Sequence, residues 1–134
     1  MVKGEEPKER RVDGVIRLPC NSDEFLRGYL EVMRPLHKLT PREMDYAAAL
    51  LKIRERIAQE VTDQGMIDKL LFDEEMKEII RKEANVEPPH AKAILYSMKR
   101  KQFILGKRIN PMYIPSWERG KPFRLMFIFK NEDN

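Results

Sequence analysis

Cysteine, histidine and glycine are all scarce in this 134-residue chain, and their scarcity argues against several classes of function. The single cysteine, Cys20, has no partner for an internal disulfide, which fits a reducing compartment, and it is expected to be half-buried after Pro19. His37 and His90 accompany no cysteine or carboxylate pattern with metal-ligand spacing, so no metal site is predicted and both are expected at the surface or at helix entries. The glycines form no cluster that could cradle a phosphate.

Long apolar runs are missing as well. No stretch reaches the roughly 18 residues that a membrane-spanning helix needs, and no signal peptide opens the sequence. Cys20 could pair with either histidine as a nucleophile, but no Gly-rich turn or oxyanion feature accompanies it. The sequence therefore predicts a protein that binds its partners without catalysis, with no cofactor, no small-molecule substrate and no membrane partner.

Charged side chains, by contrast, are abundant. They make up 36% of the residues against 42% for hydrophobic ones, so the chain can fill a core and still carry an unusually ionic surface. Lys and Arg number 26 and acidic residues 22, which gives a net charge of +4. Such a mixed surface permits nucleic acid as a partner without requiring it. A length of 134 residues favours one domain around one core.

Residues 1–20 are predicted to form an extended N-terminal arm. The part up to Asp13 alternates charge with Gly and Pro and has almost nothing to bury, so it should be disordered in an isolated chain. The run Gly14–Pro19 is short and β-prone, and it could add a strand to an edge. Residues 131–134 form a polar tail, which leaves residues 21–130 for the domain itself.

The first element of that domain is an accessory helix. Asn21 can cap it, and Glu24 follows three residues later as in a capping box. The helix should stop by Arg34, because Pro35 disfavours helical geometry at the residue before it. Its many apolar residues indicate that it packs against the main domain.

The strongest local signal in the sequence surrounds Thr40. Pro41 follows it in the first helical position, and Glu43 stands at the spacing of a capping box. A long helix with a wide apolar face is therefore predicted from Pro41 to about Gly65.

Two further helices are expected after a short apolar connector over residues 66–72. Asp73 can cap the first of them, which ends near Asn85. The second begins after Pro89 and ends in the basic run Lys99–Lys101, where cations suit the helix dipole.

Beyond Gln102 the spacing of apolar residues changes to two. Phe103–Leu105 and Ile109–Ile114 are interpreted as one interrupted strand, followed by a polar loop. A final strand is predicted where apolar residues occupy every other position, at Phe123, Leu125, Phe127 and Phe129. The pattern predicts a β-hairpin with a broad tip.

The stretch from Glu78 to Ile104 resembles the helix-turn-helix of winged-helix proteins: a helix, a short turn, a second helix, a basic stretch and an entry strand. The resemblance covers roughly Leu39 to Phe129. It implies an α+β fold, a winged helix-turn-helix with a helical body and a C-terminal β-hairpin wing, preceded by the accessory helix and the charged arm. The core between its two helices is expected to contain Ile79, Ala84, Val86, Ile94 and Leu95.

In DNA-binding winged-helix proteins, the start of the second helix enters the major groove. The corresponding segment, Glu87–Ala93, offers no Arg, Asn or Gln for bidentate contacts with bases, and Glu83 and Glu87 would lie near phosphates. Contacts with the phosphate backbone remain feasible. The candidate nucleic-acid-binding residues, on one stripe of this helix and on the predicted wing, are Lys92, Tyr96, Arg100, Arg119 and Lys121.

The run Phe25–Leu51 also resembles small proteins of tailed bacteriophages, including the crAss-like group. This resemblance implies a structural protein, such as a connector or ring component, in the host cytoplasm or the virion, with neighbouring protein subunits as partners. Trp117 lies in a polar loop and is predicted to be an interface anchor, since aromatic residues are enriched at interfaces; the alternative is that it folds back over the wing. The candidate interface residues are Trp117, Arg10, Arg11 and Ile16.

Two functions therefore remain open. The first is an oligomeric assembly protein that binds neighbouring subunits, and the second is a DNA-binding regulator of transcription or replication. The poor base-reading chemistry of the Glu87–Ala93 segment favours the first.

Overall fold

The capping box predicted at Thr40 is present, and it starts the helix around which the rest of the chain folds. In the computed structural model, which describes residues 14–133, the Thr40 hydroxyl accepts the Glu43 backbone N–H at 3.2 Å. The Glu43 carboxylate accepts the Thr40 N–H at 3.0 Å. Helix α3 (Pro41–Ala58) begins there, and its buried side chains lie on most sides of its first two-thirds, as expected for a central helix.

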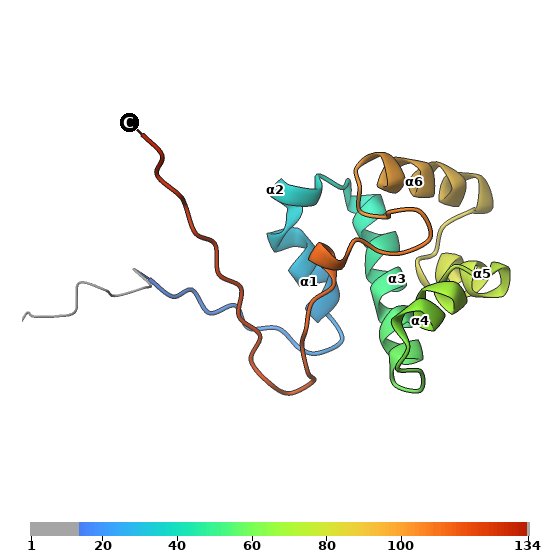
Figure 1. Cartoon of the computed structure of the whole chain (residues 1–134), viewed down its shortest axis with the longest axis horizontal. Coiled ribbons are helices and arrows are strands. Elements are labelled where there is room, and N and C mark those ends of the chain that lie inside the picture. The colour runs from blue at the N-terminus through green and yellow to red at the C-terminus, as the bar shows by residue number, and fades with distance from the viewer. Residues whose placement is uncertain (1–13, 134) are drawn as a thin grey trace, which may run out of the picture.

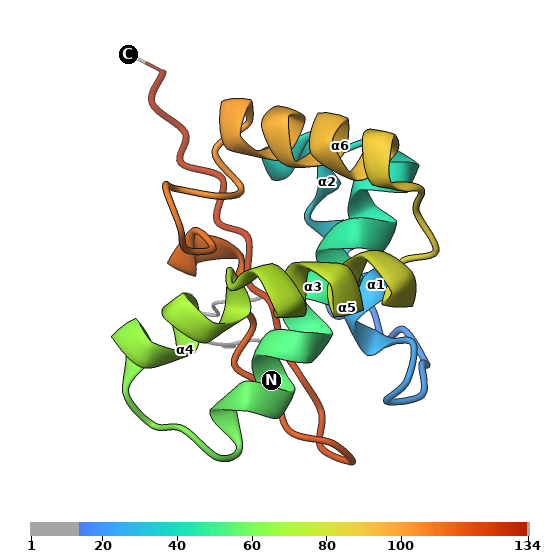
Figure 2. The same cartoon turned by 90° about the vertical axis from the view of Figure 1, so that its right-hand side faces the viewer.

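The other helices surround α3. Helices α1, α4, α5 and α6 each contact it, and Figure 1 shows α1 on one side, α4 and α5 on the other, and α6 beside the start of α3. In Figure 2, α5 crosses in front of α3 with α6 above it. The bounds are α1 Phe25–Val32, α2 Arg34–His37, α4 Gln64–Leu71, α5 Glu74–Glu83, α6 Pro88–Arg100 and the 3₁₀ helix η1 Pro111–Tyr113. None of the helices between residues 14 and 133 is long and apolar enough to cross a bilayer.

The accessory helix is shorter than predicted. Asn21 does not cap α1; its side chain accepts the Glu24 N–H at 3.0 Å and closes a turn just before the helix. Helix α1 ends before Arg34, as expected, but Pro35 then stands in the first turn of the short helix α2. This is compatible with proline, because the first turn needs no N–H donor there.

The predicted long helix to Gly65 is wrong, since α3 ends at Ala58 and a separate helix, α4, occupies most of the predicted connector. The Asp63 carboxylate starts α4 by accepting the N–H groups of Gly65 at 2.8 Å and Met66 at 3.3 Å. The expected core between α5 and α6 needs one correction as well. Ile79 is exposed and its neighbour Ile80 is buried, while Val86 and Ile94 are buried as predicted.

The predicted C-terminal β-hairpin wing is absent, so the α+β winged-helix fold is wrong: residues 14–133 are helical and contain no β-strand. Only an isolated antiparallel bridge joins Ile104 and Ile109. Pro111 ends this pairing because it has no N–H and begins η1. Tyr113 is then buried against Phe103, with ring centroids 5.1 Å apart, and the chain continues across to α1 instead of returning beside the bridge.

Candidate functional site

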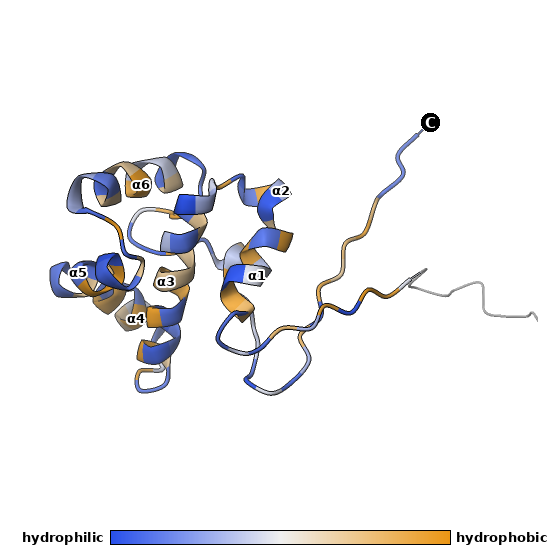
Figure 3. Ribbon diagram, turned by 180° about the vertical axis from the view of Figure 1, so that it is seen from behind, coloured by the Kyte–Doolittle hydropathy of each residue, from blue (hydrophilic) through white to orange (hydrophobic). Residues whose placement is uncertain are grey.

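Two extended segments leave the helical body near one another. Residues 14–20, the N-terminal segment, precede α1, and residues 121–133, the C-terminal segment, follow the loop after η1. Near their bases, Arg119 Nη1 lies 3.4 Å from Asp23 Oδ1. Figure 1 shows both segments on the side of the body away from α4 and α5, and Figure 3 shows apolar stretches of both in orange.

Aromatic packing holds the base of the C-terminal segment. The Trp117 ring stacks on Phe25 of α1 with centroids 4.3 Å apart. Phe123 meets Phe25 edge-on at 5.0 Å and Tyr29 at 5.9 Å. The structure thus places Trp117, half-buried, against the body of its own chain, with the Arg119 guanidinium 5.7 Å from its ring. Its role as an interface anchor stays a prediction.

Beyond Phe123 the C-terminal segment carries an uninterrupted exposed apolar run, Leu125–Phe129. The exposed fraction rises from 41% at Leu125 to 52% at Phe127 and 95% at Phe129. The predicted strand used only the alternating positions of this run. Met126 between them is exposed as well, so the run is apolar on both faces of an extended backbone. That signal was available in the sequence, because a wing strand with one solvated face would alternate with polar residues.

The remaining predicted interface residues are only partly described. Arg10 and Arg11 lie outside the described residues. Ile16 is 86% exposed in the N-terminal segment, together with Val15 and Leu18. Its place in an interface stays a prediction.

The predicted nucleic-acid-binding residues fall into two separate groups. Lys92, Tyr96 and Arg100 are exposed on α6, where the Arg100 guanidinium lies 5.9 Å from the centre of the Tyr96 ring; we call these three the α6 stripe. Arg119 and Lys121 are also exposed, but Arg119 belongs to the loop after η1 and Lys121 begins the C-terminal segment that follows this loop. Figures 1 and 2 both show that loop at the opposite end of the molecule from α6, so one ligand surface does not unite the two groups.

The α6 stripe belongs to a part of the chain that has no acidic residue. Neither Asp nor Glu occurs between Pro88 and Trp117, whereas the basic residues there are Lys92, Lys99, Arg100, Lys101, Lys107 and Arg108. One of these charges is neutralised locally. Lys101 Nζ lies 2.8 Å from Glu43 Oε1 and donates to the Lys38 carbonyl at 3.0 Å. Burial disfavours ionisation of Glu43, but hydrogen bonds from Lys101 and Ser97 outweigh it and lower the pKa of this carboxyl.

Two expectations about isolated reactive residues are wrong. His37, expected at the surface or at a helix entry, ends α2 and is buried between α1, Phe103 and Tyr113. Cys20, expected to be half-buried, is exposed in the N-terminal segment. His90 is exposed at the start of α6, as expected.

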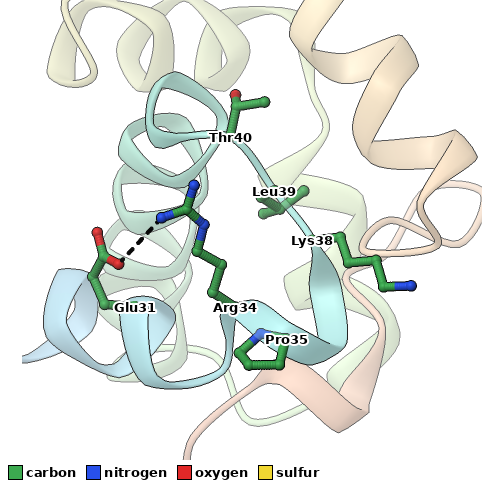
Figure 4. A pocket seen from close by; sticks show the side chains of 6 residues that line it. All are labelled: Glu31, Arg34, Pro35, Lys38, Leu39 and Thr40. Atoms are coloured by element: carbon green, nitrogen blue, oxygen red, sulfur yellow. Dashed lines mark ion pairs between the residues drawn. The ribbon is translucent and has the colours of Figure 1, made fainter.

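An open depression lies between the end of α1 and the start of α3. Figure 4 shows its lining residues, with Arg34 reaching toward Glu31, where Nη1 and Oε1 are 3.9 Å apart. Lys38 points away from this pair, so the charged groups do not converge on a common point as they would in a ligand site.

The described residues contain no group of three or more His, Cys, Asp and Glu side chains that could hold a metal ion. The described residues instead present two separate surfaces. The apolar C-terminal segment lies at one end of the body and the basic helix α6 at the other. Comparison of the chain with models of protein families, with curated proteins and with solved structures gave no significant match.

Proposed function

We propose that the chain is a non-enzymatic assembly protein, of the kind found in bacteriophage particles, that binds neighbouring subunits through its C-terminal segment. The observation that carries this proposal is the exposure of the apolar run Leu125–Phe129 on an extended backbone. A contiguous exposed apolar stretch marks an interaction site in soluble proteins, because each side chain gains about 1.5 to 3 kcal/mol on full burial.

The backbone of the run supports the same proposal. From Phe123 to Lys130, no backbone N–H or C=O group makes a hydrogen bond within the described part of the chain. A row of unpaired backbone groups on a β-prone segment is a template for pairing with another chain. Strand addition of this kind combines backbone hydrogen bonds with pockets for alternate side chains.

The aromatic anchor at the base of the C-terminal segment favours specific assembly over unspecific hydrophobic association. Because Trp117 and Phe123 pack on Phe25, the apolar run leaves the body at a defined place. A neighbour that receives the run therefore also receives a defined orientation of the helical body, which a connector or ring requires.

The test uses the full chain in extracts of the cells that naturally contain it. A truncated chain ending at Phe123 keeps the aromatic anchor, and Met112→Asp serves as a control because Met112 is an exposed apolar residue outside both segments. We expect the wild type and the control to sediment in particles much larger than the monomer, and the truncated chain to sediment as a folded monomer. A monomeric wild type, or normal assembly of the truncated chain, would contradict the proposal.

A second candidate function, binding of nucleic acid, rests on the α6 stripe and the acid-free stretch around it. Lys92 and Arg100 can reach phosphates, and the exposed Tyr96 ring offers a surface on which a base can stack. The start of α6 still lacks side chains for bidentate base contacts, so this surface favours binding to the backbone without sequence preference. The two functions use opposite ends of the molecule and do not exclude each other.

A further inference from the structure

We propose that the partner of the C-terminal segment is the same segment of a second copy of this chain, paired with it in antiparallel orientation. This inference rests on the proposed function and names its partner. The segment is extended, its backbone groups are unpaired, and its residues 125–129 carry apolar side chains on both faces. An identical strand can supply the missing backbone hydrogen bonds and cover these side chains.

The charges of the segment select the orientation. Lys121 and Arg124 precede the apolar run, whereas Glu132 and Asp133 end the segment. Antiparallel pairing places the basic start of one copy against the acidic end of the other. Parallel pairing would place basic residues opposite basic ones and acidic opposite acidic, and like charges directly across a strand pair are destabilising.

The same charges select the register. When Ile128 faces Ile128 of the second copy, Arg124 faces Glu132 and Phe127 faces Phe129 of that copy. Met126 then faces Lys130, whose aliphatic stem can cover it. A shift by two residues toward the body aligns the apolar runs completely but places Arg124 opposite Lys130, so like charges meet at both ends of the pair. A shift by one residue is excluded by symmetry, because in a two-fold pair of identical antiparallel strands it would place side chains of opposite faces across from each other.

Within a single chain these charges are available for exchange. Glu132 pairs with Lys130 of its own segment at 3.3 Å, and both side chains are more than two-thirds exposed. An ion pair of this kind contributes little to stability. Glu132 can therefore turn to Arg124 of the second copy at little cost.

The first experiment measures self-association of the purified full-length chain by sedimentation equilibrium. We expect a discrete dimer, or a closed oligomer built from such pairs, whose dissociation constant rises at least about a hundredfold in Phe127→Asp. Met112→Asp, which adds the same charge at an exposed apolar position outside the segment, should leave that constant unchanged.

The second experiment tests orientation and register by charge reversal. Arg124→Glu and Glu132→Arg should each raise the dissociation constant about tenfold, because each dimer contains two such cross-strand pairs. The double variant should associate like the wild type. This rescue is not expected from an unspecific loss of charge.

Three results would overturn the inference. In parallel pairing, an equimolar mixture of wild type and Arg124→Glu would associate more tightly than either alone. Polydisperse aggregates insensitive to both charge reversals would show unspecific association. A purified chain that stays monomeric while the same chain sediments in large particles from its native extract would exclude the second copy as partner, yet leave the proposed function standing.

Discussion

The buried imidazole of His37 offers the sharpest test of the structure. Its Nε2 lies 2.8 Å from the Leu30 carbonyl oxygen, and its Nδ1 lies 2.9 Å from the Leu39 backbone nitrogen. Because a backbone N–H can only donate, Nδ1 must accept, so Nε2 carries the proton and donates to Leu30. The ring is therefore held in one neutral tautomer that joins α1 to the start of α3.

Replacing His37 with Leu keeps an apolar side chain at the site but removes both hydrogen bonds. The Leu30 carbonyl and the Leu39 N–H then lose their partners, at a cost of roughly 1–3 kcal/mol each. We expect the free energy of unfolding to fall by about 2–6 kcal/mol, a large share of the roughly 5–15 kcal/mol typical of a domain. His90→Leu, at an exposed histidine, is the matched control and should change it by less than about 0.5 kcal/mol.

Acid should weaken the fold through the same residue. Burial lowers the pKa of His37 below its ordinary value of 6.5, helped by the nearby charges of Arg34 and Lys101 and opposed by the hydrogen bond to Leu30. The unfolded chain then binds a proton more readily than the folded one. The contribution of neutral His37 is complete above about pH 6.5, and stability falls as pH drops below that value toward the folded pKa.

Urea denaturation followed by circular dichroism, at a series of pH values from about 8 to 5, measures both effects. Wild type and His90→Leu should lose stability in the acid part of this range, while His37→Leu should start lower and vary less. Carboxyls with lowered pKa, such as Glu43, lose their contribution only at more acid pH, below the ordinary value of 4.5. Equal stabilities of the two variants, or parallel pH profiles for wild type and His37→Leu, would refute the buried neutral tautomer.

Two further predictions concern the helical body. Thr40→Ala removes the capping hydrogen bond to Glu43 and should cost about 1 kcal/mol, whereas Ile94→Ala opens a cavity in the core and should cost about 2–5 kcal/mol in the same denaturation assay. If duplex DNA binds the α6 stripe, Lys92→Ala with Arg100→Ala should weaken binding equally for all sequences and flatten its salt dependence, as measured by fluorescence anisotropy. A loss of discrimination at one base pair with unspecific affinity intact would contradict that assignment.

The helices that could be predicted are those whose start is encoded locally. Thr40 and Glu43 stand three residues apart, so the cap of α3 can be recognised without knowing the rest of the fold. The start of α4 was encoded in the same way, in the Asp63 side chain, but its helix is only 8 residues long and its apolar residues were interpreted as a connector. Short apolar runs do not distinguish a helix from a buried connector by periodicity alone.

Contacts between distant residues could not be predicted in this way. The burial of His37 depends on Phe103 and Tyr113, which lie far along the chain. No local sequence pattern around His37 indicates these contacts. The same is true of Lys101, which was assigned only to the basic run at the end of its helix and which the fold pairs with Glu43. The basic end of α6 therefore carries less free charge than its sequence indicates.

The prediction of a β-hairpin wing was wrong for a related reason, and this reason also bears on function. A period-two pattern shows that a segment can form a strand, but the hydrogen bonds of a strand must come from a partner that the pattern does not name. The loop from Trp117 to Phe123 is held against Phe25, so the C-terminal segment starts on the α1 side of the body, away from the bridge at Ile104. The apolar run thus keeps its capacity to pair while its own chain supplies no strand among the described residues. A partner outside the chain is what such a segment requires, and the charges at its two ends match those of a second, antiparallel copy.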